Sequence, residues 1–113
     1  MLAKKYRLSK RGSFGYVYRN GKSQSENKLT LSCVYCKGAP KVGFSVPNKV
    51  GKAVVRNKLK RRLRAIAACL LPSLKPAQIV ISAKEGSASL DFRQLENTVT
   101  VLLGRAGLIK EGK

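Results

Sequence analysis

The stretch from Lys49 to Leu71 constrains the fold most, because one side of it must be buried while the rest is strongly basic. Its large apolar side chains recur three or four residues apart, which is the spacing of one face of an α-helix. These side chains are Leu59, Leu63, Ile66 and Leu70, with Val55 just beside them at 100° per residue. No acidic residue interrupts the stretch. We therefore expect an amphipathic helix over residues 52–70 that packs against a core along one side only.

The other sides of this predicted helix carry side chains that can contact a phosphate or the edge of a base. They are Arg56, Asn57, Lys58, Lys60, Arg61, Arg62 and Arg64. Lys60 and Arg64 lie four residues apart on one flank, and Lys58 lies on the opposite flank. Like charges four residues apart repel each other by about 0.2–0.5 kcal/mol per pair. A polyanion would remove this repulsion, so the pattern favours a nucleic-acid-binding surface over a merely solvated helix face.

The net charge of +19 is distributed unevenly along the 113 residues. Eighteen of the 24 lysines and arginines precede residue 65, together with a single acid, Glu26, whereas the rest of the chain is close to neutral. Such one-sided basicity points to nucleic acid, and more weakly to an acidic membrane surface. With 43% hydrophobic residues the chain can bury a core. We therefore expect one RNA-binding domain over residues 1–113.

The sequence lacks the groups that a protein-based hydrolase needs. It contains no histidine, and its five acids are scattered, so we find neither a nucleophile beside a general base nor a set of metal ligands. Cys33 and Cys36 have a zinc-like spacing, but only Cys69 remains as a third ligand, whereas a structural zinc site needs four. We predict no catalytic residue and no metal site in the polypeptide, free and mostly buried thiols, and no disulfide-linked partner.

Targeting signals are missing as well. No apolar run approaches the ~18 residues of a membrane span. The N-terminal residues lack the apolar core of a signal peptide. Together with free thiols, these features predict a cytoplasmic protein without a membrane partner.

Periodicity and turn signals predict six regular elements. They are helices at 10–20, at 52–70 and from Asp91 to near Gly104 or Gly107, and strands at 28–36, 41–46 and 77–83. The first two strands are expected to form a hairpin, and Asp91 with Gln94 resembles a capping box. A basic arm at 1–8 and a frayed tail at 108–113 flank these elements. The order helix, strand, strand, helix, strand, helix indicates an α+β fold, a single-domain sandwich of helices against a central mixed sheet.

Two aromatic residues of the first predicted helix have two possible roles. Phe14 and Tyr18 lie four residues apart, on one side of the helix. This spacing is equally compatible with packing in the core and with an exposed stacking platform. Cationic residues lie nearby in the sequence, namely Arg11, Arg19 and Lys22.

The segment KVGFSVPNKVGKAVVRNKLKRRLRAI resembles the signature region of the protein component of bacterial ribonuclease P. That family has a strand of the type R-V-G-x-S-V, where x is small or apolar, followed by K-x-G-x-A-V-x-R-N-x-x-K-R-x-x-R. The matching positions are residues 41–46 and then Lys49, Gly51, Ala53, Val54, Arg56, Asn57, Lys60, Arg61 and Arg64. Further matches are Arg7-Leu8, Phe14, Tyr18 and Asn20-Gly21. The resemblance covers residues 4 to about 105.

The resemblance implies a function that is divided between a protein and an RNA. Ribonuclease P removes the 5′ leader of precursor tRNA by means of a catalytic RNA that uses Mg²⁺, and the family's protein binds that RNA and contacts the leader. We therefore expect an accessory subunit of an endoribonuclease, with the catalytic RNA and precursor tRNA as partners and with Mg²⁺ bound mainly by the RNA. The resemblance also implies a left-handed βαβ crossover around the basic helix, where general connection rules predict a right-handed one.

The resemblance also assigns two sets of residues to two different RNAs. The catalytic RNA is expected at Arg56, Asn57, Lys58, Arg61, Arg62 and Arg64. The leader is expected at Phe14, Tyr18, Ser45, Lys49, Lys60 and Arg64, in a cleft between the central sheet and the basic helix. Ser32 stands where some relatives carry an aromatic residue, and neither Ser32 nor Phe44 is assigned a base contact.

Two other classes of protein share part of this pattern. A small basic ribosomal protein would explain the charge but not the motif. A double-stranded DNA binder would use the basic helix in a major groove, but the sequence lacks a second crossing helix and a dimer seam. Sequencing the RNA that copurifies with the protein separates these possibilities. A ribosomal protein would copurify with ribosomal RNA, whereas a ribonuclease P protein would copurify with tRNA precursors and one long non-ribosomal RNA.

Overall fold

The computed structural model describes residues 11–35 and 40–109, except for the side chains of residues 11–14 and 20. The predicted arm at 1–8, Cys36 and residues 110–113 lie outside the described part. The helices are α1 (Arg11–Asn20), α2 (Ala53–Leu70) and α3 (Phe92–Arg105), and the strands are β1 (Lys22–Glu26), β2 (Leu29–Tyr35), β3 (Lys41–Ser45) and β4 (Ala77–Ala83). Among the described residues, the short 3-10 helices η2 (Asn48–Val50), η3 (Leu71–Ser73) and η4 (Ser87–Ser89) follow β3, α2 and β4. All six predicted elements are confirmed, and β1 is an additional strand.

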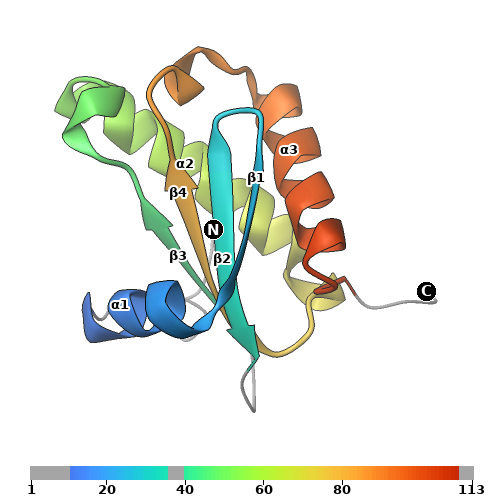
Figure 1. Ribbon diagram of the computed structural model, residues 1–113. Coiled ribbons are helices and arrows are strands. Elements are labelled where there is room, and N and C mark those ends of the chain that lie inside the picture. The colour runs from blue at the N-terminus through green and yellow to red at the C-terminus, as the bar shows by residue number, and fades with distance from the viewer. Residues whose placement is uncertain (1–10, 36–39, 110–113) are drawn as a thin grey trace.

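The four strands form one mixed sheet in the order β1-β2-β4-β3 (Figure 1). Strand β4 lies between β2 and β3, antiparallel to the former and parallel to the latter. The predicted hairpin between the strands at 28–36 and 41–46 is therefore wrong, because these strands are consecutive in sequence but are not neighbours in the sheet. The physical reason lies in β4, whose nearly continuous apolar run suits a central strand that is covered on both faces.

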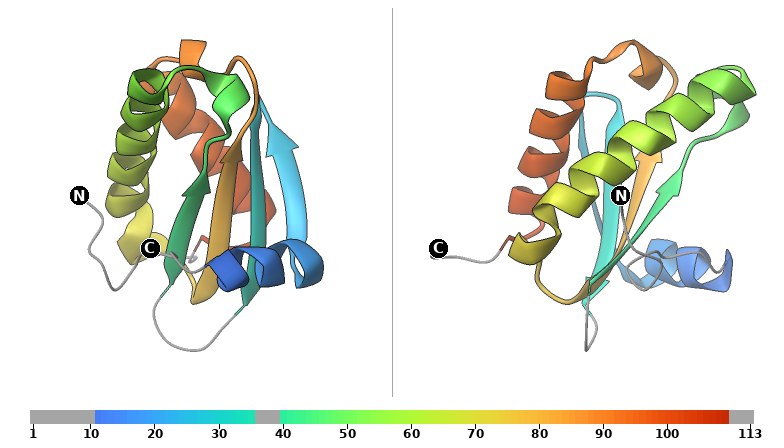
Figure 2. Two further views of the ribbon diagram at one scale, coloured as in Figure 1. Left: turned by 90° about the vertical axis from the view of Figure 1, so that its left-hand side faces the viewer. Right: turned by 180° about the vertical axis from the view of Figure 1, so that it is seen from behind.

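The parallel connection from β3 through α2 to β4 is left-handed. Seen from the side of the sheet that α2 covers, with both strands pointing upward, β4 lies to the left of β3 (Figure 2, right). This arrangement confirms the expectation drawn from the family resemblance, and it departs from the rule that such connections are right-handed.

Strand β1 is the element that periodicity does not reveal, because its sequence KSQSE contains no apolar residue. It pairs with β2 at the edge of the sheet, from Lys22 opposite Cys33 to Glu26 opposite Leu29. Asn27 and the following Lys28 form the intervening turn with positive φ angles of 45° and 69°, as tight two-residue hairpin turns require. Backbone hydrogen bonding, rather than side-chain burial, thus places this strand.

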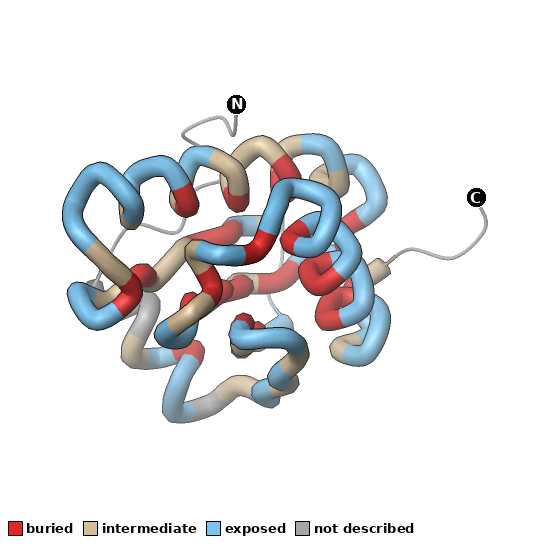
Figure 3. Tube along the Cα trace, turned by 90° about the horizontal axis from the view of Figure 1, so that it is seen from above, coloured by how far each residue is buried: buried red, intermediate tan, exposed pale blue. Residues whose placement is uncertain are grey.

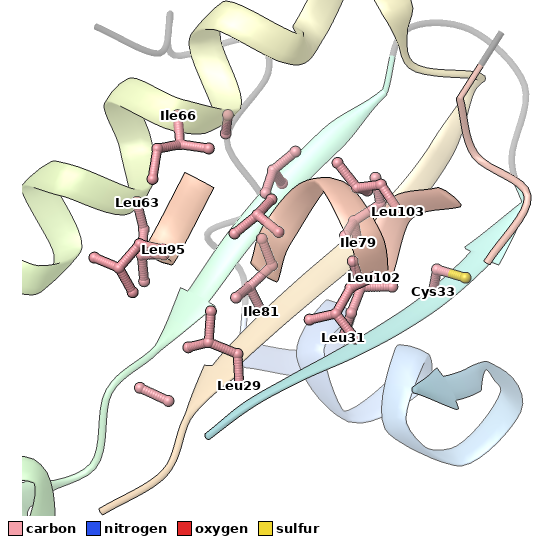
Figure 4. Close-up of a cluster of buried hydrophobic side chains, with 14 of the residues drawn as sticks. Leu29, Leu31, Cys33, Leu63, Ile66, Ile79, Ile81, Leu95, Leu102 and Leu103 are labelled. Carbon is pink, nitrogen blue, oxygen red and sulfur yellow. The ribbon is translucent and has the colours of Figure 1, made fainter. Parts of the chain in front are cut away.

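Helices α2 and α3 cover one face of the sheet, and α1 lies on the opposite face (Figures 1 and 2). Viewed from above, the buried positions of α2 and α3 lie on the sides that these helices turn toward the sheet (Figure 3). The predicted stripe of α2 is buried at Leu59, Leu63 and Ile66, which share one core with Ile79 and Ile81 of β4 (Figure 4). This apolar contact determines which sides of α2 remain available to a partner.

Helix α3 begins with the predicted capping box. The backbone N–H of Gln94 donates to Oδ1 of Asp91 (2.8 Å), and the backbone N–H of Asp91 donates to Oε1 of Gln94 (3.0 Å). The predicted apolar face is buried at Leu95, Val99, Leu102 and Leu103. Phe92 differs, because it is the first residue of the helix and remains 43% exposed.

The chain after α3 is better anchored than the sequence suggests. Leu108 is fully buried, its N–H donates to the carbonyl of Leu103 (3.0 Å), and its own carbonyl accepts from Lys75 (2.8 Å). Ile109 forms a β-bridge with Leu74. The predicted frayed tail at 108–113 is therefore wrong for its first two residues, because they complete the core beneath η3.

Candidate nucleic-acid interface

The packing of α2 leaves all its predicted RNA-binding side chains accessible. We call Arg56, Asn57, Lys58, Lys60, Arg61, Arg62 and Arg64 the cationic surface of α2. Each of them is exposed or half-buried, and none is covered by the core. Arg56 is partly fixed, because its Nε donates to the carbonyl of Gly51 (3.1 Å). Within residues 11–35 and 40–109 the one ion pair is between Arg105 and Glu26 (3.1 Å), so the cationic surface of α2 has no acidic partner there.

The cationic surface of α2 has two flanks that face different surroundings. Lys58 and Arg62 lie on the flank toward α3, where they line a groove with the segment Ala88–Asp91. Lys60 and Arg64 lie on the opposite flank, by the 100° rotation per residue. Figure 2 (left) looks onto the β3 edge of the sheet, with α2 on one side and α1 on the other. Thus Lys58 and Arg62, predicted to bind the catalytic RNA, lie on one flank of α2, and Lys60 and Arg64, predicted to bind the leader, lie on the other.

The face of the sheet that carries α1 is lined by hydroxyl groups. We call Ser23, Ser25, Thr30, Ser32, Ser45 and Ser82 the hydroxyl face, because their register places them on the same side as Val80. Val80 packs with Val17 of α1 and with Val34. Neighbouring hydroxyls pair across β1 and β2, with oxygen distances of 3.0 Å for Ser23 and Ser32 and 3.1 Å for Ser25 and Thr30. Because these side chains are small, an RNA strand can approach the backbone of the sheet closely on this face.

Tyr18 connects α1 to the hydroxyl face. Its ring is 47% exposed, and its hydroxyl lies 2.9 Å from Oγ of Ser82. Ser82 is opposite Ser45 in the parallel ladder of β3 and β4. The structure therefore brings two of the predicted leader-binding residues, Tyr18 and Ser45, to one place. Phe14 lies in α1, but its side chain is outside the described part.

The expected cleft between the sheet and the basic helix is not where these residues lie. Tyr18 and Ser45 are on the face opposite α2, and the space between α2 and the sheet is filled by core side chains. The predicted leader set is therefore divided between the two faces, with Lys60 and Arg64 on α2 and Lys49 exposed in η2 after β3. The reason is that the apolar stripe of α2 must contact the sheet directly, so only a path around the β3 edge joins both parts.

Three residues show what sequence reasoning left open or missed. Ser32 is 2% exposed and paired with Ser23, and Phe44 lies partly buried against the main core on the α2 side. Neither side chain is placed to stack on a base over the hydroxyl face. Ser82 belongs to this face but was not singled out, although polar residues at 78 and 82 within the apolar run of β4 are a signal that one side of this strand is covered only in part.

The described residues bring together no three side chains of the metal-ligating types histidine, cysteine, aspartate and glutamate. Cys33 and Cys69 are both free thiols. Cys33 is buried, and this burial raises the pKa of its thiol, while the nearby charge of Lys22 opposes the shift. Cys69 is exposed, so the prediction of mostly buried thiols is wrong for this residue, which lies outside the apolar stripe of α2.

The sequence was compared with models of known protein families to find the family to which this fold belongs. The family model of ribonuclease P matches residues 2–107. The chain belongs to the ribonuclease P protein family. A ribonuclease P protein component from a Cyanothece species is 36% identical, with 96% of this chain and 98% of that protein covered. The component from Symbiobacterium thermophilum is 37% identical, with coverage of 96% and 97%.

Solved structures of ribonuclease P proteins share the fold. A Staphylococcus aureus ribonuclease P protein mutant matches with a TM-score of 0.87 and 26% identity, covering 94% of this chain and 92% of that one. The Thermotoga maritima ribonuclease P protein, in complex with 1-(4-fluorophenyl)-2-thiourea, matches with a TM-score of 0.82 and 28% identity, covering 88% and 98%. The function is therefore that of a ribonuclease P protein component, an accessory subunit in a tRNA-processing ribonucleoprotein.

Proposed function

We propose that this chain binds the catalytic RNA of ribonuclease P with the cationic surface of α2 and holds the 5′ leader of precursor tRNA over the hydroxyl face. It thereby assists the endonucleolytic cut that produces the mature 5′ end of the tRNA. The observation that carries this proposal is the placement of a cationic helix and a hydroxyl-lined sheet surface on opposite faces of one sheet. A protein built in this way can contact two RNA strands without either strand displacing the other.

The assignment to the catalytic RNA rests on charge and accessibility. Lys58 and Arg61 are exposed on α2, and neither forms an ion pair with a described acid. Neutralising phosphates with such side chains releases counterions, which provides most of the affinity for structured RNA. The predicted members Arg56, Asn57, Arg62 and Arg64 extend the same surface.

The assignment to the leader rests on the pairing of an aromatic ring with hydroxyls. Single-stranded nucleotides stack on aromatic side chains with about 1–3 kcal/mol per base, and Tyr18 offers an accessible ring beside Ser45 and Ser82. Phe14, one helical turn earlier, remains a predicted member. Lys49, Lys60 and Arg64 would contact leader phosphates only if the strand passes the β3 edge.

The chemistry of the cut belongs to the RNA in this proposal. Mg²⁺ would be bound mainly by the catalytic RNA, as the family resemblance implies. None of the described helices is long and apolar enough to cross a membrane. We propose a cytoplasmic location, where the RNA partners and reduced thiols are found.

Reconstitution with a cognate catalytic RNA and 5′-labelled precursor tRNA tests the proposal. We expect Arg61→Ala to weaken binding to the catalytic RNA, and Arg93→Ala, which removes an exposed arginine from α3, to leave it unchanged. Tyr18→Ala should weaken binding of precursor tRNA to the holoenzyme but not binding of mature tRNA, which has no leader. If Arg93→Ala and Arg61→Ala weaken binding equally, only net charge matters and the surface assignment fails.

A further inference from the structure

A groove outside the hydroxyl face lies between the first half of α2 and the segment that enters α3. Its volume is about 460 Å³, which is within the ~300–1,000 Å³ range of small-molecule and cofactor sites. Val54, Val55, Lys58 and Arg62 line it from α2, and Ala88 and Asp91 line it from the opposite side. The groove is partly open to solvent, so a group attached to a polymer can enter it.

The walls of the groove combine apolar surface with one-sided positive charge. Val54 is 79% exposed and Val55 is 38% exposed, so the two adjacent residues give the α2 wall a solvent-accessible apolar surface. Lys58 and Arg62 lie four residues apart on the same wall and form no ion pair with a described residue. A flat apolar group with anionic groups on one side would satisfy both features.

Asp91 gives the opposite wall a negative charge. One oxygen of its carboxylate already accepts the N–H of Gln94, and the carboxylate as a whole is exposed at the groove. A phosphate at this wall would be repelled, whereas the amino group of a base would donate to the carboxylate. The two walls therefore orient a nucleotide, with its phosphates toward α2 and the edge of its base toward α3.

We propose, on the basis of the proposed function, that this groove holds an unpaired base of the catalytic RNA. RNA is recognised mainly at unpaired nucleotides whose bases are turned out and stacked on protein side chains, including the planes of arginines such as Arg62. The groove is continuous with the cationic surface of α2, so the RNA that covers this surface also delivers the base. The leader is not the expected occupant, because Tyr18 and Ser45 lie on the other face of the sheet.

Filling the groove without changing its charge tests this inference. Ala88→Phe places a ring in the groove from the η4 side, and Val101→Phe, at a 41% exposed position on α3, is the matched control. In nucleotide-resolution chemical footprinting of the catalytic RNA, the wild-type protein should protect a discrete unpaired nucleotide. Ala88→Phe should abolish that protection and weaken binding on the order of tenfold, while Val101→Phe should preserve both.

A second variant separates loss of the site from loss of the fold, because Ala88 packs partly against the core. Val54→Ser removes part of the apolar wall at a solvent-exposed position and should weaken the same protection with an unchanged thermal melting curve. The inference is overturned if Val54→Ser leaves the footprint intact, or if Ala88→Phe instead alters protection of the leader. A wild-type protein that does not bind the catalytic RNA at all would contradict the proposed function itself.

Discussion

At the scale of single residues, the contact between Tyr18 and Ser82 is the feature that orders the hydroxyl face. The hydrogen bond at 2.9 Å joins a side chain of α1 to the central strand β4. It holds the ring of Tyr18 near Ser45 instead of leaving it free in solvent. We interpret Ser82 as a positioning residue for stacking on the leader.

A double-mutant cycle tests this role. Tyr18→Phe keeps the ring and removes the hydrogen bond, and Ser82→Ala removes the partner hydroxyl. Each change should weaken binding of precursor tRNA by about 0.5–1.5 kcal/mol, the usual net value of one hydrogen bond. The double variant should be no weaker than either single variant. Fully additive losses would mean that the two side chains act separately.

Cys33 makes stability depend on pH in a direction that follows from its burial. The pKa of its thiol is raised above the ordinary value of 9.0, so the folded chain keeps a proton that the unfolded chain loses. The contribution of this thiol to the free energy of unfolding is fully present below pH 9.0 and is lost as the pH rises through the folded-state pKa. Chemical denaturation of the wild type and of Cys33→Ala should show a smaller alkaline loss in the variant. If the free energy of unfolding falls equally with pH in both proteins, groups other than Cys33 cause the alkaline loss.

At the scale of elements, α2 serves two purposes with different sides. Its stripe of Leu59, Leu63 and Ile66 anchors it on the sheet, and its remaining sides carry unneutralised cations. These purposes conflict, because like charges destabilise the helix that presents them. Substituting a cation of α2 should therefore raise stability and weaken RNA binding, whereas substituting its apolar stripe should lower stability.

Two substitutions separate these purposes. Leu63→Ala, at a fully buried position, should lower the free energy of unfolding by about 2–5 kcal/mol. Arg61→Ala should raise it by about 0.2–0.5 kcal/mol for each relieved pair with Lys58 and Arg64, although it weakens RNA binding. Urea denaturation and RNA titration of the same samples provide the comparison. A destabilised Arg61→Ala would indicate that this arginine has a structural partner.

At the scale of the whole molecule, the left-handed β3–α2–β4 connection separates the two proposed RNA surfaces. It places α2 on the face opposite α1 (Figures 1 and 2), and the residues on these two sides make one a cationic layer and the other a hydroxyl face. The net charge of +19 then acts over the entire molecule as a long-range attraction for RNA.

Salt dependence measures this whole-molecule effect. Affinity for the catalytic RNA should fall steeply with salt concentration, and Arg61→Ala should reduce the slope of log K against log salt by about 0.9 if the contacted RNA behaves as a duplex. Tyr18→Ala should leave this slope unchanged, because stacking releases no counterions. A slope that is unaltered in Arg61→Ala would place that side chain away from phosphates.

The sequence by itself determined the elements whose signals are local. The periodicity of Leu59, Leu63 and Ile66 predicted α2, the apolar run at 77–83 predicted β4, and Asp91 with Gln94 predicted the start of α3. These predictions succeeded because helix periodicity, strand burial and capping depend on residues that are close in the chain. The motif around Arg56 identified the family for the same reason.

Only the tertiary structure decided how these elements meet. The polar strand β1 exists because β2 offers it backbone partners, and β4 separates β2 from β3 because a strand covered on both faces belongs in the middle of a sheet. The handedness of the crossover, which the family resemblance implied but which helix and strand periodicity do not encode, then placed Tyr18 and α2 on opposite faces. Leu108 is buried in the same core as Leu74 and Ile79, which are far from it in the sequence. Contacts between distant segments depend on the global packing of the core, and local sequence signals do not contain them.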